Sequence, residues 1–168
     1  MIQRTPSEDI KRIFQLQSAH ANLMRLRATS VSERLRKVRA VKSYLLRKEN
    51  MEMLCKALHT DLRKSRSETE ANELAPVLLV IKHIEDNLRK WVSDRKVETP
   101  LAMSGLSSHV RYDSKGAVLV IAPWNYPLQL ALGPVVGALA AGNRVMLKPS
   151  ELTPRTAALL ERAVGETF

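Results

Sequence analysis

The chain has 168 residues and a formal net charge of +10, and 45% of its residues are hydrophobic while 26% are charged. This composition excludes a disordered or fibrous protein and predicts one soluble globular unit. The single cysteine, Cys55, excludes an internal disulfide, and the N-terminus has no apolar core of signal-peptide length, so we expect a cytoplasmic protein.

The positive charge is concentrated in the first part of the chain. Residues 116–168 contain only four basic and three acidic side chains, so nearly all of the excess lies before them. A basic surface can attract nucleic acid or an anionic ligand. No aromatic residues alternate with these charges, as a stacking platform for bases requires. We interpret them as solvated helix faces, and keep as an alternative a basic helical interaction module that binds nucleic acid or an acidic partner.

Helical periodicity dominates the first half. Apolar residues recur on one face over residues 7–24, where Ser7 is available as an N-cap. A second helix follows over residues 30–46. Its start is predicted from Ser30 and Glu33, which have the spacing of a capping box.

Two further helices are expected before residue 98. One begins at Asn50 and buries Cys55 in the core. The next begins at a second cap signal, Ser67 with Glu70, and its apolar stripe continues to residue 91. Because proline removes a backbone donor and clashes with the preceding turn, Pro76 predicts a kink or break in this long helix.

The second half alternates strands and helices, as in a doubly wound α/β fold. The apolar run Ala117–Ile121 is typical of a strand covered on both faces. Gly142 suits the left-handed residue after a helix, and Thr153 with Pro154 suits a helix start. The expected elements are a loop after residue 98, a short strand at 109–112, a strand at 117–121, a helix at 127–141, a strand at 144–148 and a helix from 154.

Residues 116–143 form a stretch of 28 residues without a charged side chain, which is long enough to span a membrane. Prolines, glycines and polar residues divide it into shorter apolar pieces, so we predict a buried strand, a loop and a helix rather than a transmembrane segment. Ligands of open α/β sheets bind beyond the carboxyl ends of the strands. Residues 122–126 and 149–152 are therefore the candidate site, although no glycine-rich phosphate-binding motif is present.

Both loops lie within one segment, GAVLVIAPWNYPLQLALGPVVGALAAGNRVMLKPSELTP. Its order of apolar strand, PWNYP, helix closed by AGN, second strand and KPSE resembles the aldehyde dehydrogenase superfamily, most closely its class 3 and coniferyl-aldehyde-type members. RKSRSETEANELAPVL is also similar to the family's N-terminal helices. The resemblance implies N-terminal helices at 1–98, a loop and short strand at 99–115, and at 116–168 the first half of a Rossmann-like parallel-sheet NAD(P)-binding domain, incomplete.

The resemblance implies a catalytic role for Asn125, whose side-chain amide would donate to the aldehyde oxygen as it becomes an oxyanion. From the residues alone, this asparagine could instead cap the following helix or serve the turn before Pro127. Lys148 and Glu151 are similar to residues that bind the adenosine ribose, although Lys148 could instead pair with Glu151 or extend to the surface. The other cofactor-binding residues that the resemblance implies are Ile121, Ala122, Pro123, Trp124 and Ser150, with Trp124 favoured as a packing residue.

The implied activity is oxidation of aldehydes to carboxylic acids by NAD or NADP through a cysteine thiohemiacetal, in a homodimer that binds no nucleic acid. The family's nucleophilic cysteine follows the lysine strand, whereas Cys55 precedes it, so we expect this chain to be inactive alone. The histidines lack metal-ligand spacing, and no metal is expected. A third hypothesis is a fragment that associates through exposed sheet edges. The aldehyde and the choice of NAD or NADP stay open.

Overall fold

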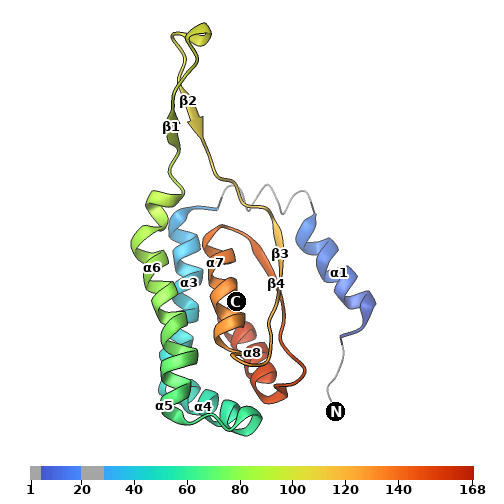
Figure 1. The fold of residues 1–168 in the computed structure, drawn as a ribbon. Helices are drawn as coiled ribbons and strands as arrows, with labels where there is room; N and C mark the ends of the chain where they lie inside the picture. Colours follow the sequence, from blue (N-terminus) through green and yellow to red (C-terminus); the bar gives the residue numbers. More distant parts are fainter. Residues whose placement is uncertain (1–4, 20–28) are drawn as a thin grey trace.

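The computed structural model describes residues 5–19 and 29–168, and Figure 1 shows helices packed beside a pair of parallel strands, with a narrow hairpin extending away from them. The expected helix at 7–24 is described only to its end at Ser18, and Ala21 and Met24 lie outside the described residues. The helical elements before the hairpin are α1 (Ser7–Ser18), α3 (Val31–Leu46), α4 (Lys48–Leu62), α5 (Arg66–Glu68), a π-helical segment (Thr69–Leu74) and α6 (Ala75–Trp91).

The helix starts confirm one predicted cap and correct others. Ser30 accepts a hydrogen bond from the amide of Glu33 at 3.2 Å, as the capping-box spacing predicts. Ser7 is already inside α1, which has no side-chain cap. The cap of α5 is Ser65 rather than Ser67, because its hydroxyl accepts from the amide of Glu68 at 3.1 Å. The third helix begins two residues earlier than expected, at Lys48.

The expected break at Pro76 takes the form of a change in helix type. Residues Thr69–Leu74 are π-helical, and α6 starts at Ala75 with Pro76 in its first turn. Because proline has no amide hydrogen, the regular hydrogen-bond ladder is interrupted at this position. π-helical turns occur frequently at functional sites. Here the segment contains Glu73, whose side chain is completely buried.

An antiparallel hairpin links the helices to the parallel strands. Its strands are β1 (Arg95–Val97) and β2 (Ser108–Val110), and a short 3-10 helix, Leu101–Met103, lies between them. The expected strand at 109–112 is therefore displaced by one to two residues, and its partner β1 was not predicted. In Figure 1 this hairpin extends away from the helices as an arm.

Strands β3 (Ala117–Ile121) and β4 (Arg144–Lys148) pair in parallel, which confirms the first half of a Rossmann-like α/β domain after N-terminal helices. α7 (Gln129–Ala140) connects them and contacts both, and α8 (Pro154–Thr167) follows. α7 starts two residues later than expected from Pro127. Gly142 has a φ of +81°, as predicted for the residue after a helix.

The prediction that the first strand is covered on both faces is wrong for the described residues. Val120 is 7% exposed, whereas Leu119 is 59% and Ile121 is 67% exposed. The side chains of a strand alternate between faces, and within the described residues only one face at this end is packed by helices. A single hydrophobic cluster on that side includes fully buried residues of the helical half and the strand half: Val38, Leu58, Val77, Ile81, Ala131 and Val136.

Candidate functional site

The carboxyl ends of β3 and β4 lie at the same edge of the sheet. The strands pair in register, with Ile121 opposite Lys148. The amide of Ala122 donates to the carbonyl oxygen of Lys148 at 3.0 Å, which extends the ladder by one bond. The loops at 122–126 and 149–153 therefore begin side by side, where ligands of parallel α/β sheets bind.

Asn125 presents its side chain to solvent from the first loop. Among residues 5–19 and 29–168, no partner hydrogen-bonds its side-chain amide, whereas its backbone carbonyl accepts from Lys64 Nζ at 2.8 Å. The first amides of α7, those of Leu128 and Gln129, donate to Glu73 instead. Asn125 therefore does not cap this helix, and its amide is available to a ligand.

Lys148 and Glu151 form an ion pair at the start of the second loop. Lys148 Nζ lies 2.6 Å from Glu151 Oε2, and the side chains are 55% and 58% exposed. The local pairing considered from the sequence is thus present. Because both charges remain hydrated, either one can exchange its partner for a ligand at low cost.

The other predicted cofactor-binding residues differ in exposure. Ile121, Pro123 and Trp124 are exposed, and Trp124 retains 50% of its surface rather than packing into the interior. Ala122 is buried at 3%. Ser150 is also buried, and its hydroxyl accepts from the amide of Leu152 at 3.2 Å, so it shapes the turn.

A buried ion pair beneath the first loop escaped the sequence reasoning. Lys64 Nζ lies 2.6 Å from Glu73 Oε1, with the side chains 8% and 0% exposed. The only signal in the sequence is a lysine and a glutamate nine residues apart, in a polar turn and the helix after it. Residues nine apart are not neighbours on a regular helix, where contacts join residues three or four apart. The sequence therefore does not show that the pair is buried or that it reaches the PWNYP loop.

Cys55 is half-buried on α4 and does not reach the core as expected. Burial raises the pKa of its thiol, a shift that Arg66 opposes. A raised pKa lowers the thiolate fraction at neutral pH, and the thiolate is the nucleophilic form. Cys55 therefore has the properties of a structural thiol.

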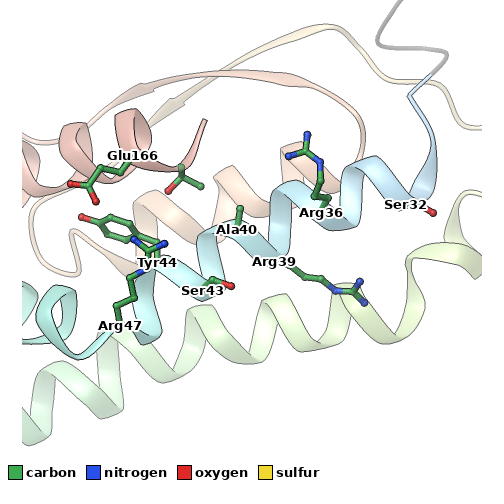
Figure 2. Close-up of a pocket in the computed structure, with 9 residues that line it drawn as sticks. Ser32, Arg36, Arg39, Ala40, Ser43, Tyr44, Arg47 and Glu166 are labelled. Carbon is green, nitrogen blue, oxygen red and sulfur yellow. The ribbon is translucent and has the colours of Figure 1, made fainter.

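A surface hollow of about 450 Å³ lies elsewhere, between α3 and the end of α8 (Figure 2). Arg36, Arg39 and Arg47 line it, but Arg39 points away from it and binds Glu85 of α6 at 2.8 Å. Glu166 lies beside Tyr44, at the same end as Arg47, and adds a negative charge. None of the predicted site residues lines this hollow.

Comparison with known proteins decides the family. The family model described as "Aldehyde dehydrogenase family" matches residues 1–167. The chain belongs to the aldehyde dehydrogenase family. It is 41% identical over 137 residues to 4,4'-diaponeurosporen-aldehyde dehydrogenase of Staphylococcus aureus, covering 81% of this chain and 28% of that protein.

Two further relatives agree. The chain is 43% identical over 145 residues to aldehyde dehydrogenase family 3 member B1 of Bos taurus, covering 82% of this chain and 31% of that protein. The solved structure of Staphylococcus aureus AldH in a substrate-bound state superimposes with a TM-score of 0.86 at 35% identity, over 95% of this chain and 34% of that one. This aldehyde dehydrogenase chain thus spans about a third of the length of the relatives it matches.

In the described part of the chain, no helix has the length and apolarity needed to cross a membrane.

Proposed function

We propose that the protein to which this chain belongs oxidises aldehydes to carboxylic acids with NAD or NADP, and that Asn125 supplies a catalytic hydrogen bond. The observation that carries this proposal is the exposed side chain of Asn125 at the carboxyl end of β3, fixed through its backbone and without a side-chain partner among the described residues. The family membership of the chain supports the reaction class.

The chemistry of Asn125 suits an aldehyde oxygen. When a nucleophile adds to the carbonyl carbon, the oxygen gains negative charge, and a fixed N–H donor stabilises that charge more than it stabilises the neutral aldehyde. A neutral amide donates without a change of its own protonation state. Cys55 is half-buried on α4, so we propose that it is not the nucleophile and that this chain alone forms no NADH.

Lys148 and Glu151 fit the ribose of a dinucleotide. A ribose diol offers both donors and acceptors, and the pair places an ammonium and a carboxylate together, exposed at the end of β4. We propose that these two residues bind the ribose, that the backbone of Ile121, Ala122, Pro123 and Trp124 lines the same cleft, and that Ser150 shapes the turn beside it. When bound, the nicotinamide supplies the acceptor for the aldehyde hydrogen.

The hairpin arm supports a homodimer as part of this proposal. Its tip exposes Leu101, Met103 and Leu106, which are 94%, 54% and 69% exposed. Such a group of apolar side chains on an extended arm favours contact with another subunit.

Many of the basic side chains of the helices pair with acidic neighbours, as Lys42 does with Glu85, which supports a solvated surface rather than a nucleic-acid site. We place the protein in the cytoplasm because the single thiol of this chain, Cys55, is free and forms no disulfide within these residues.

A chimaera tests the proposal. This chain would replace the matching N-terminal region of the Staphylococcus aureus relative, and NADH formation would be followed with several aldehydes. We expect activity that Asn125→Ala lowers by roughly a hundredfold to a thousandfold in kcat. Asn87→Ala is the matched control, because among the described residues that side chain bonds only to His83 within α6, and the kcat of the variant is expected to stay unchanged.

Two results would count against this function. Wild-type kcat in the Asn125→Ala chimaera would remove the catalytic role of the amide. Steady NADH formation by the isolated chain would show that the nucleophile lies within these 168 residues after all.

A further inference from the structure

We propose that Lys64 and Glu73 are positioning residues that hold the PWNYP loop, residues 123–127, so that Asn125 presents its amide to the aldehyde oxygen. The inference rests on the proposed function in one respect, the catalytic role of Asn125. The hold on the loop itself is argued from contacts that do not depend on that role.

Lys64 fixes the middle of the loop. Its Nζ donates to the backbone carbonyl of Asn125 at 2.8 Å and lies 4.0 Å from the centre of the Tyr126 ring. A cation over an aromatic face is attracted by the negative potential of the ring. Two neighbouring residues of the loop therefore bind the same buried ammonium.

Glu73 fixes the end of the loop. Its Oε2 accepts from the amides of Leu128 and Gln129 at 3.1 and 3.0 Å, while its Oε1 accepts from Lys64 at 2.6 Å. α7 has no side-chain cap of its own, since Leu128 stands at the cap position and offers no acceptor. A carboxylate supplied by the π-helical segment therefore satisfies the start of α7, where the helix dipole favours negative charge.

The two residues act together on consecutive stretches of backbone, at Asn125 and just after it. Lys64 binds the loop at residues 125 and 126, and Glu73 binds residues 128 and 129, which directly follow the loop. The 2.6 Å ion pair joins these anchors, and both side chains are shielded from water. Both anchors therefore act on the loop and the start of α7 through backbone atoms and one ring.

The consequence for Asn125 follows from this arrangement. Its backbone is held while its side-chain amide stays free of partners in the described residues, so the donor is oriented without being consumed. Preorganised donors stabilise a developing charge better than mobile ones, because no reorganisation accompanies the reaction. Small displacements of a catalytic group can cost up to roughly a hundredfold in rate.

The first test measures the loop and does not require turnover. Trp124 precedes Asn125, and Trp91→Phe removes the other of the two tryptophans, which leaves Trp124 as the reporter. In this background we expect Lys64→Met/Glu73→Gln to lower the fluorescence anisotropy of Trp124. The double substitution removes both charges at once, so no unpaired charge remains in the interior, and the introduced glutamine side chain keeps an oxygen for the amides of α7.

A matched pair controls for the loss of an ion pair in general. Lys42 and Glu85 form a bridge of 2.9 Å between α3 and α6, away from the loop. Lys42→Met/Glu85→Gln is expected to leave the anisotropy of Trp124 unchanged. Lys64→Arg retains a cation with donors for Glu73 and for the Asn125 carbonyl, and it should restore part of the anisotropy lost in Lys64→Met.

The second test measures the reaction in the chimaera. We expect Lys64→Met/Glu73→Gln to lower kcat by roughly tenfold to a hundredfold, with the KM for NAD unchanged, because the substitution displaces the donor and leaves Lys148 and Glu151 in place. Lys42→Met/Glu85→Gln should leave both constants unchanged.

The two tests separate this inference from the proposed function. Unchanged anisotropy of Trp124 in a folded Lys64→Met/Glu73→Gln chain would overturn the inference, whatever the activity. Should the double variant not fold, the single variants Lys64→Met and Lys64→Arg are compared instead: a lower anisotropy of Trp124 in a folded Lys64→Met chain than in Lys64→Arg supports the hold on the loop, and equal anisotropies overturn it. A fall in anisotropy with wild-type kcat would mean that Asn125 is not catalytic, so that the proposed role fails while the hold on the loop stands.

Discussion

Two lysine–glutamate pairs flank the candidate site, and their shortest nitrogen–oxygen distances are both 2.6 Å. Lys64 and Glu73 lie beneath the loop after β3, with side chains 8% and 0% exposed. Lys148 and Glu151 lie at the end of β4, with side chains 55% and 58% exposed. The pairs therefore have the same shortest distance but differ in how far they are shielded from water.

That difference decides what each pair can do. Buried charges interact strongly but have lost their hydration, so removing one partner leaves the other in an unfavourable position. Exposed charges interact weakly through water and give up a partner easily. The buried pair is suited to hold backbone in place, and the exposed pair is suited to exchange its partner for a ligand.

The largest expected effect comes from breaking the buried pair on one side. Glu73→Ala leaves Lys64 buried without its counter-ion and leaves the amides of Leu128 and Gln129 without an acceptor. We expect the free energy of unfolding to fall by about 3–5 kcal/mol. Urea unfolding followed by circular dichroism measures it.

The matching change at the exposed pair is the control. Glu151→Ala should lower the free energy of unfolding by no more than about 1 kcal/mol. Equal losses in Glu73→Ala and Glu151→Ala would show that burial does not distinguish the two pairs.

The start of α8 extends the comparison to a carboxylate that has no lysine partner in the part of the chain that the structure describes. Asp61 of α4 accepts from the amides of Arg155 and Thr156 at 3.2 and 2.8 Å, and from the Thr156 hydroxyl at 2.8 Å. Asp61→Ala should lower the free energy of unfolding by about 1–2 kcal/mol, the usual cost of a lost helix cap. Asp61→Asn keeps an acceptor and should recover most of this loss in the same urea titration; a loss equal to that of alanine would show that the contact is not a cap.

These two helix starts also show where the sequence could and could not predict the molecule. The apolar run at 117–121, the left-handed Gly142 and the first-turn Pro154 are local signals, and each corresponds to a described feature. Asn125 follows β3 and Lys148 is the last residue of β4, so their common edge could be predicted from topology.

The acceptors at α7 and α8 could not be predicted, because they come from distant residues. Glu73 is 55 residues from Leu128, and Asp61 is 95 residues from Thr156. The sequence suggested Thr153 as the cap of α8, yet its hydroxyl does not bind the first amides of that helix. Tertiary contacts supply acceptors wherever local ones are absent, and no short-range pattern records them.

Glu85 forms ion pairs of intermediate burial with Lys42 and Arg39. Their contribution to stability should depend on pH. Hydrogen bonds from Lys42 and then Arg39 hold the pKa of Glu85 below its ordinary value of 4.5. A carboxyl whose pKa is lower in the folded state stabilises the fold above its unfolded pKa, and this stabilisation disappears as pH falls through the folded pKa.

Removing the Glu85 carboxylate should therefore weaken the acid dependence of stability. In Glu85→Gln we expect a loss of about 1 kcal/mol at neutral pH that shrinks below about pH 4. Thermal unfolding over this pH range measures the difference. A loss that stays constant down to low pH would show that the Glu85 charge does not contribute.

The smallest effect on stability is expected at Lys148, and it is the one that links the comparison to function. Lys148→Met removes an ammonium that is already hydrated, so the free energy of unfolding should change by about 0.5 kcal/mol or less. If the proposed ribose contact is correct, the same change should raise the KM for NAD in the chimaera about tenfold, as expected for a lost hydrogen bond to a charged group. Lys82→Met provides the control, because Lys82 pairs with Asp86 at 2.9 Å on the exposed face of α6. If Lys148→Met instead lowers the free energy of unfolding and leaves the KM for NAD unchanged, Lys148 is a structural residue like those of the buried pair. The distinction between a pair that holds the backbone and a pair that binds the ligand would then be wrong.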